Sequence, residues 1–138
     1  MADLSRTPFL GRYLRILVLT TVALTVLSMV LTRWNLVAVP AGALAILPPA
    51  IASYLAGRAW GQAEGVGPSG RAAWIWSILA ALAYLAVQVL LLPLAFLGGP
   101  FGREMLLPGV GILAMVSLAA ILVHRVFVAL GARHGAAG

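Results

Sequence analysis

Long apolar runs that are almost free of charge constrain this chain more than any other feature. Four runs are long enough to cross a bilayer as helices, which takes about 20 mostly apolar residues. They cover residues 14–31, 36–56, 72–92 and 106–130. Their only charged side chains are Arg15, at the start of the first run, and Arg125, near the end of the fourth. We therefore predict one all-α, polytopic membrane domain over residues 1–138, with four transmembrane helices arranged as two antiparallel hairpins.

Composition supports contact with lipid over most of the surface. The chain is 63% hydrophobic and 9% charged, whereas soluble domains carry about 25% charged residues. It contains no cysteine, which excludes disulfides, thiol catalysis and cysteine-ligated metal centres. Its nine basic residues are all arginine and lie singly between apolar runs, so nucleic acid is not an expected partner.

The distribution of arginine predicts the orientation of the helices. Four spans place both termini and residues 57–71 on one side of the membrane. That side holds seven of the nine arginines: Arg6, Arg12, Arg15, Arg58, Arg71, Arg125 and Arg133. Arg33 and Arg103 fall on the other side. Because cytoplasmic segments are enriched in basic residues, we predict that both termini are cytoplasmic. Tyr13, Trp34, Trp60, Trp74 and Trp76 fall at predicted helix ends, where aromatic rings prefer the interface.

The most polar stretch, GRAWGQAEGVGPSGR at residues 57–71, is predicted to be the turn between the second and third helices. Gly65 and Gly67 disfavour helix, and Ser69 can cap the helix that follows. Arg58, Trp60, Arg71 and Trp74 are expected to anchor the two helix ends at the interface. The alternative is a dedicated partner-binding loop, since Glu64 is not required by a turn.

Small and weakly polar side chains form three stripes at helical spacing. Helices in lipid associate through such residues, because the bilayer provides no hydrophobic drive between them. The stripes are Thr21, Thr25, Ser28 and Thr32 in the first helix, Ala73, Ser77, Ala81, Tyr84 and Gln88 in the third, and Ser117, Ala120 and His124 in the fourth. We expect all three to face the bundle interior as packing surfaces. The alternative is that they line a polar path.

Two adjacent prolines, Pro48 and Pro49, interrupt the second helix near its middle. Each removes a backbone donor, so the carbonyls of Leu44 and Ala45 lose their helical partners. In lipid these oxygens must find other donors, and Thr21, Thr25, Ser77 and Gln88 are the candidates. A broken helix at this depth is typical of some transporter sites, but it also occurs as a simple kink.

Gln88 is the most polar side chain inside a predicted span, and it is expected to bond a freed carbonyl or a second copy of itself. His124 is predicted to lie near the cytoplasmic end of the fourth helix, where a cation is favourable. It has no carboxylate neighbour in the sequence, so we expect no metal and no cofactor. The remaining alternative is a haem held by one histidine from each of two chains.

Several function classes lack the residues that they need. No Asp, Glu or Lys lies in a predicted span, although ion-coupled transporters normally carry one. Asp3, Glu64 and Glu104 are the only carboxylates, and they fall on different sides of the predicted membrane. No nucleophile, phosphate-binding loop or metal-ligand cluster appears, so we do not expect an enzyme.

The second hairpin resembles a family of small, uncharacterised four-span inner-membrane proteins of proteobacteria. The matching residues are Gly57, Trp60, Pro68 and Ser69, within residues 36–95. Family members often have a basic residue before that proline and an acidic residue after the serine. Here Gly67 and Ala72 or Ala73 take those places. The resemblance implies a multi-pass protein of the bacterial inner membrane and no known activity.

These features predict a structural or accessory membrane subunit. It would associate with a larger membrane complex or with itself through the small-residue stripes, so its partners are lipid and protein. The alternative is a small passive channel or uncoupled transporter, with its path near Pro48-Pro49 and Gln88.

Overall fold

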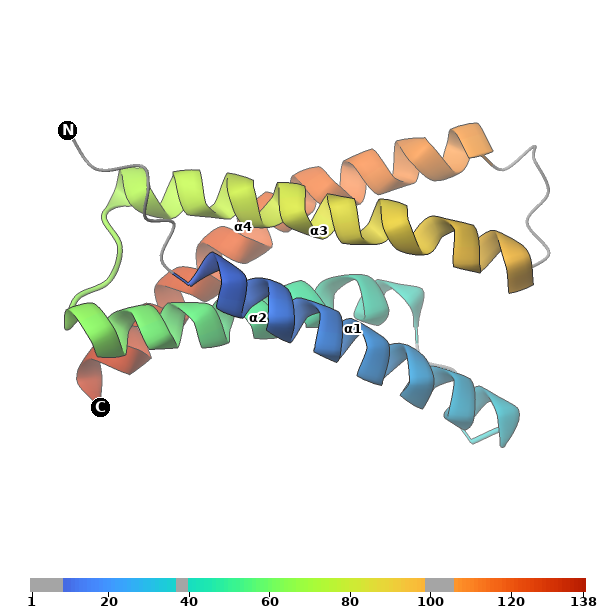
Figure 1. The fold of residues 1–138 in the computed structure, drawn as a ribbon, viewed down its shortest axis with the longest axis horizontal. Helices are drawn as coiled ribbons and strands as arrows, with labels where there is room; N and C mark the ends of the chain where they lie inside the picture. Colours follow the sequence, from blue (N-terminus) through green and yellow to red (C-terminus); the bar gives the residue numbers. More distant parts are fainter. Residues whose placement is uncertain (1–8, 37–39, 99–105) are drawn as a thin grey trace.

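The structure is a computed structural model that describes residues 9–36, 40–98 and 106–138. Four α-helices make up this part of the chain (Figure 1). They are α1 (Leu10–Arg33), α2 (Ala41–Glu64), α3 (Gly70–Gly98) and α4 (Leu106–Ala137). The predicted all-α fold is therefore confirmed over the described residues.

Three of these helices contain segments long and apolar enough to cross a membrane. The segments are Leu10–Arg33, Gly70–Leu91 and Ala114–Ala137. α2 is not among them, because Pro48, Pro49, Arg58 and Gln62 lower its hydropathy. A membrane location is thus supported by three helices, and α2 as a fourth span stays a prediction.

α2 and α4 are longer than the apolar runs that predicted them. α2 continues through the polar residues to Glu64, and α4 continues past Leu130 to Ala137. The prediction of a turn over 57–71 is therefore wrong for residues 57–64 and 70–71, and the turn itself is confined to 65–69. Glycine lowers helix propensity, but helix packing compensates for it here, as described below.

Local signals define the ends of three helices. Asn35 has a φ of 51°, and the amides of Asn35 and Leu36 donate to the carbonyls of Thr32 and Leu31, both at 3.1 Å. This is the Schellman arrangement, in which a left-handed residue ends a helix. Gly65, at a φ of 68°, ends α2. The predicted cap of α3 is confirmed, since the Ala72 amide donates to Ser69 Oγ at 3.3 Å.

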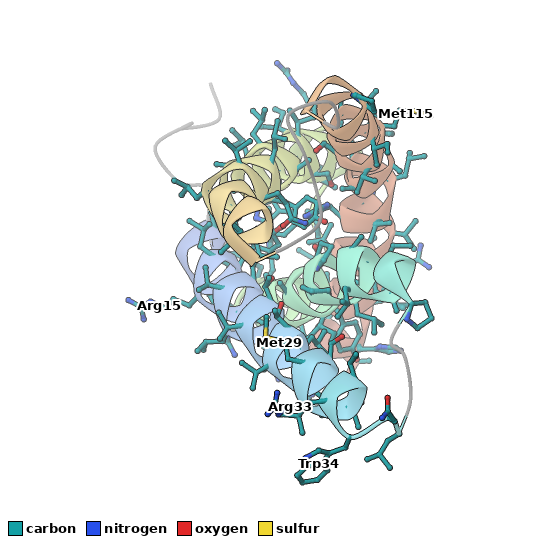
Figure 2. All side chains as sticks on the ribbon, turned by 90° about the vertical axis from the view of Figure 1, so that its right-hand side faces the viewer. Arg15, Met29, Arg33, Trp34 and Met115 are labelled. Atoms are coloured by element: carbon teal, nitrogen blue, oxygen red, sulfur yellow. The ribbon has the colours of Figure 1, made fainter. Side chains whose placement is uncertain are left out.

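α2 is the central helix of the bundle. It packs most extensively against α4 and next against α1, while α3 packs against α4. In Figure 1, the first turns of α4 lie beside the C-terminal end of α3, and the last turns of α4 lie beside α2. In the view along the bundle, the labelled side chains of Arg15, Trp34 and Met115 project outward (Figure 2).

Burial is concentrated in one half of the bundle. We call the half that contains the turn at 65–69 the inner half and the opposite half the outer half. The core lies in the inner half and the middle of the bundle and consists of Tyr13, Leu17, Ala52, Ala56, Trp76, Ala80, Tyr84, Ala120 and Val128. In the outer half, large apolar side chains such as Met29, Leu90 and Met115 are exposed. The tightly packed inner half therefore positions the polar groups considered next.

Candidate functional site

Three polar aromatic side chains from three different helices meet in the core of the inner half. Tyr13 comes from α1, Tyr84 from α3 and His124 from α4, and at most 1% of each is exposed. The His124 ring lies 5.4 Å from the Tyr13 ring and 6.3 Å from the Tyr84 ring, between centroids. Polar groups at this depth are costly unless they are hydrogen-bonded, so their partners decide whether the core is stable.

Tyr13 and His124 form a direct hydrogen bond between α1 and α4. The Tyr13 hydroxyl lies 2.5 Å from His124 Nε2 and 3.2 Å from the carbonyl oxygen of Ala80. His124 Nδ1 faces the carbonyl oxygen of Ala120 on its own helix. Because a carbonyl can only accept, Nδ1 carries a hydrogen, and in the neutral ring Nε2 accepts from Tyr13.

This arrangement has three hydrogen-bonding contacts but only two hydrogens when His124 is neutral. The single hydroxyl hydrogen of Tyr13 is shared between Nε2 and the Ala80 carbonyl. A proton added at Nε2 would release the hydroxyl to donate to Ala80 alone, and every contact would then hold its own hydrogen.

The Tyr84 hydroxyl supplies a hydrogen-bond donor to a carbonyl of α2 that proline leaves without one. Pro49 has no amide hydrogen, so the Ala45 carbonyl lacks its usual helical donor. The Tyr84 hydroxyl donates to that oxygen at 2.9 Å, and Gln88 Nε2 donates to the Tyr84 oxygen at 2.7 Å. The donor at Ala45 is therefore Tyr84, which was not among the predicted candidates, and Gln88 acts through it.

The aromatic neighbours hold the cluster in place. Trp76 packs edge-on against Tyr13, with ring centroids 5.4 Å apart, and only 2% of it is exposed. Three buried polar atoms in the described part of the chain have no hydrogen-bond partner: Thr21 Oγ1, Ser53 Oγ and Trp76 Nε1. The position of Trp76 is therefore set by ring packing rather than by its indole nitrogen.

Four glycines bring α2 and α4 into backbone contact. Gly57 and Gly61 of α2 lie against the carbonyls of Val128 and Ala132, and an added Cβ at either glycine would overlap the carbonyl oxygen. Gly131 and Gly135 of α4 are placed in the same way against the carbonyls of Tyr54 and Arg58. Close approach through glycines four residues apart is a known packing mode of membrane helices. It explains why α2 stays helical through its polar end.

The polar stripes predicted from the sequence have different environments. In α3, Ser77, Ala81 and Tyr84 are buried and Gln88 is half-buried, and Ser77 donates to its own-helix carbonyl at Ala73, at 2.7 Å. In α4, Ser117 and His124 are buried. Pro48 and Pro49 are buried in α2.

The stripe in α1 differs from the expectation. Thr21 and Ser28 are half-buried, but Thr25 and Thr32 are exposed. The inward face of α1 instead carries Tyr13 and Leu17. The Tyr13 side chain reaches the aromatic cluster from α1, since its ring packs against Trp76 and His124.

The predicted interface residues lie at the periphery. Arg12, Arg15, Arg58 and Arg71 are exposed. Trp60 is half-buried and packs against Phe9, with centroids 6.3 Å apart. The Cζ atom of Arg125 lies 5.7 Å from the centroid of the Trp74 ring, which is a cation–π distance. Tyr13 and Trp76 were expected at the interface, and the structure places both in the core instead.

Sequence reasoning missed two features of this site. The spacing of Gly57 with Gly61, and of Gly131 with Gly135, is a signal for helix association. It was hidden because one pair fell in the expected turn and the other beyond the expected end of the fourth helix. For Tyr13 the sequence holds no comparable signal, since its partners are distant in the chain.

The site has hydrogen-bonding and packing chemistry. Among the residues that the structure describes, no group of three or more His, Cys, Asp or Glu side chains comes together as metal ligands would. Comparison with protein-family models, curated proteins and solved structures gives no match to this chain. The resemblance to four-span inner-membrane proteins therefore stays a prediction.

Proposed function

We propose that this chain is a four-span protein of the bacterial inner membrane that acts as a structural or accessory subunit. It associates with a larger membrane complex or with its own copies. The four helices form two antiparallel hairpins with both termini in the cytoplasm. The lower hydropathy of α2 fits this proposal, because α1 and α4 both pack against it and shield it from lipid.

The limited burial of α1 is the observation that carries the proposal. Only 6% of the residues in its apolar window are buried, against 28% in each of the other two candidate spans. Tyr13 and Leu17 attach α1 to the bundle near its start. Beyond them, the helix presents Val22, Val26 and Met29, all at least half exposed. This length of apolar helix is free to pack against another protein.

The exposed threonines of α1 indicate where a partner would bind. Thr25 and Thr32 are exposed together with the neighbouring apolar side chains. Helix pairs in lipid favour such small, weakly polar residues at their contact. The stripe of Ser77 and Ala81 in α3 is unavailable to a partner, because both residues are already buried within the bundle.

The interior favours association over permeation. A path at Pro48-Pro49 would need space beside these prolines, yet both are buried. The Tyr84 hydroxyl occupies the carbonyl that Pro49 leaves free. Gln88 is engaged by the same hydroxyl. The polar groups that would line a channel are thus used to close the bundle.

The experiment that tests the proposal is gentle extraction from native membranes, followed by mass determination of the intact assembly. We expect a second protein in fixed ratio, or a defined number of copies of this chain. Thr25→Phe should reduce that association several-fold, because the larger side chain replaces a small contact residue on the exposed face.

Ala86→Phe is the matched control, since Ala86 is a small, exposed residue that lies on α3 rather than on α1. It should leave the assembly unchanged. Purification of a lone monomer would contradict the proposal. An ion or solute flux in vesicles that Gln88→Leu alters would favour the passive channel instead.

A further inference from the structure

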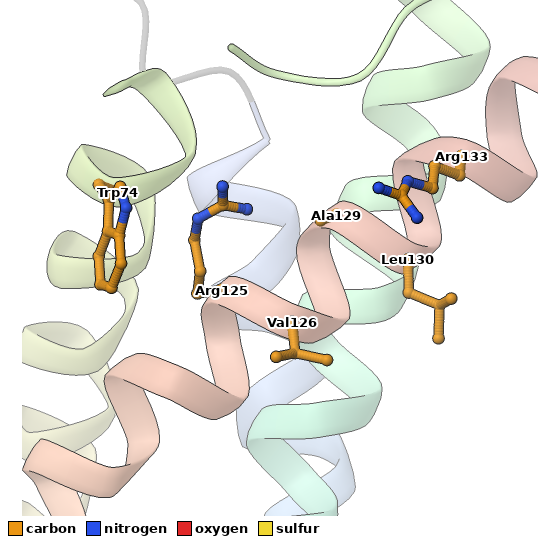
Figure 3. A pocket seen from close by; sticks show the side chains of 6 residues that line it. All are labelled: Trp74, Arg125, Val126, Ala129, Leu130 and Arg133. Carbon is orange, nitrogen blue, oxygen red and sulfur yellow. The ribbon is translucent and has the colours of Figure 1, made fainter. Parts of the chain in front are cut away.

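A groove on the exposed face of α4 is lined by arginines and by apolar side chains. It is lined by Trp74, Arg125, Val126, Ala129, Leu130 and Arg133 and has a volume of about 450 Å³. Figure 3 shows the guanidinium groups of Arg125 and Arg133 on either side of Ala129. The groove lies in the inner half of the bundle, beside the start of α3.

The spacing of the two arginines lets them converge on one anion. Arg125, Ala129 and Arg133 follow each other at four-residue intervals on one face of α4, so the arginine backbones are about 12 Å apart along the axis. The small side chain of Ala129 leaves the space between them open. Trp74 stacks against Arg125, which holds that guanidinium over the groove.

Among the residues that the structure describes, no acidic side chain lines the groove to balance its positive charge. Glu64 is the only carboxylate side chain in the described ranges 9–36, 40–98 and 106–138, and it does not line the groove. Two neighbouring cations without an acidic partner favour an anionic ligand. Guanidinium groups match phosphate particularly well, because they donate planar, paired hydrogen bonds.

The rest of the lining favours a ligand that also has an apolar part. Val126 and Leu130 lie one helical turn apart and are 60% and 41% exposed, so they form an apolar strip next to the arginines. Trp74 also lines the groove, and tryptophan side chains prefer the boundary between headgroups and acyl chains. A ligand that fits both parts carries a phosphate and a hydrocarbon chain.

We propose that this groove binds an anionic phospholipid. Its phosphate lies between Arg125 and Arg133, and one acyl chain runs along Val126 and Leu130. Basic pockets at the cytoplasmic ends of membrane helices recognise such lipids in other systems. This inference requires that the chain is embedded in a bilayer, but it does not depend on an accessory role.

The test is lipid binding by the purified full chain in detergent, measured by native mass spectrometry. The protein is titrated with phosphatidylglycerol and, separately, with phosphatidylcholine of the same acyl chains. We expect tighter binding of phosphatidylglycerol. Arg125→Gln or Arg133→Gln should weaken it about fivefold, and the double variant about 25-fold, if each arginine contributes independently.

Arg15→Gln is the matched control, because Arg15 is exposed on α1 and points away from the bundle (Figure 2). It should change phosphatidylglycerol binding less than twofold. Equal loss in this control would show that only net charge matters and would overturn the site. Equal binding of the two lipids would do the same.

A further arm separates the lipid from its headgroup. Inorganic phosphate at millimolar concentration should not displace phosphatidylglycerol, because it lacks the acyl chain that contacts the apolar strip. Full displacement would show that free phosphate is the ligand. Val126→Asn should weaken lipid binding without creating any response to phosphate.

Discussion

At the scale of single residues, the Tyr84 hydroxyl replaces the amide hydrogen that Pro49 lacks. The two residues are far apart in the chain, yet the hydroxyl lies 2.9 Å from the Ala45 oxygen. A backbone carbonyl in lipid has no water with which to form a hydrogen bond, so its only donors are protein groups. A proline pair in mid-helix is therefore tolerated because a neighbouring helix supplies the missing donor.

Removal of that donor should destabilise the bundle. Tyr84→Phe leaves the Ala45 carbonyl and the Gln88 amide without their partner, and we expect a loss of about 1 to 2 kcal/mol in the free energy of unfolding. Unfolding by dodecyl sulfate in mixed micelles, followed by circular dichroism, measures this change.

Tyr54→Phe serves as the matched control, since Tyr54 bonds His134 at 3.1 Å at an exposed site. Water can replace that bond, so the control should change the free energy of unfolding by less than about 0.5 kcal/mol. If the two variants behave alike, the Ala45 carbonyl does not depend on Tyr84.

At the scale of helices, contact between α2 and α4 is set by backbone rather than by side chains. Gly57 and Gly61 lie against carbonyls of α4, and Gly131 and Gly135 lie against carbonyls of α2. The reciprocal arrangement increases van der Waals contact along the crossing, which is the main attraction available between helices in lipid. The same contact accounts for the central position of α2.

A single methyl group at this crossing should force the two helices apart. Gly57→Ala places a Cβ onto the Val128 carbonyl, and overpacking of this kind costs about 1 to 3 kcal/mol. The dodecyl sulfate unfolding midpoint should fall accordingly.

Gly42→Ala is the control within the same helix, because an added Cβ there meets nothing within 4 Å. It should be neutral or stabilising by up to about 1 kcal/mol, since alanine has the higher helix propensity. A fall in both midpoints would mean that the α2–α4 contact is not the cause.

At the scale of the whole molecule, the bundle is packed unevenly along its length. Its core residues lie in the inner half and the middle of the bundle, while side chains such as Met29 and Met115 in the outer half remain exposed. Because apolar surface in lipid carries no hydrophobic penalty, the outer half does not need to close on itself. It is therefore the part most suited to contact with a partner.

The proposed topology is testable because the chain contains no cysteine. Single cysteines at Asn35, Ser69 and Ala137 can be labelled with a membrane-impermeant thiol reagent without any background. If α2 spans the membrane, Asn35→Cys should react from outside the cell, whereas Ser69→Cys and Ala137→Cys should react only after lysis. Labelling of Asn35→Cys and Ser69→Cys from the same side would show that α2 does not cross.

Much of the helical pattern was predictable, because it depends on local sequence. The apolar runs locate all four helices, and Ser69 marks the start of α3 as expected. Both α2 and α4 were predicted to end too early, since they continue through glycines that the sequence pattern assigns to a turn or a tail. Propensity disfavours glycine in a helix, and only contact between helices reverses that preference.

The candidate site was predictable only in part. Tyr84, Gln88 and His124 appear in the predicted stripes, because helical spacing places them on defined faces. Their partners on other helices were not predictable: His124 bonds Tyr13 of α1, and Tyr84 bonds the Ala45 carbonyl of α2. Such pairs depend on how the helices are rotated and shifted relative to one another, which no local pattern encodes.

The sequence by itself determined that this is a helical protein whose apolar segments suit a membrane, because charge and hydropathy follow from composition along the chain. The tertiary structure alone decided that Tyr13 lies in the core and that the Tyr84 hydroxyl bonds the Ala45 carbonyl of α2. It also decided that four glycines bring α2 and α4 into contact. These features arise from contacts between distant residues, whose energies exist only once the helices have packed.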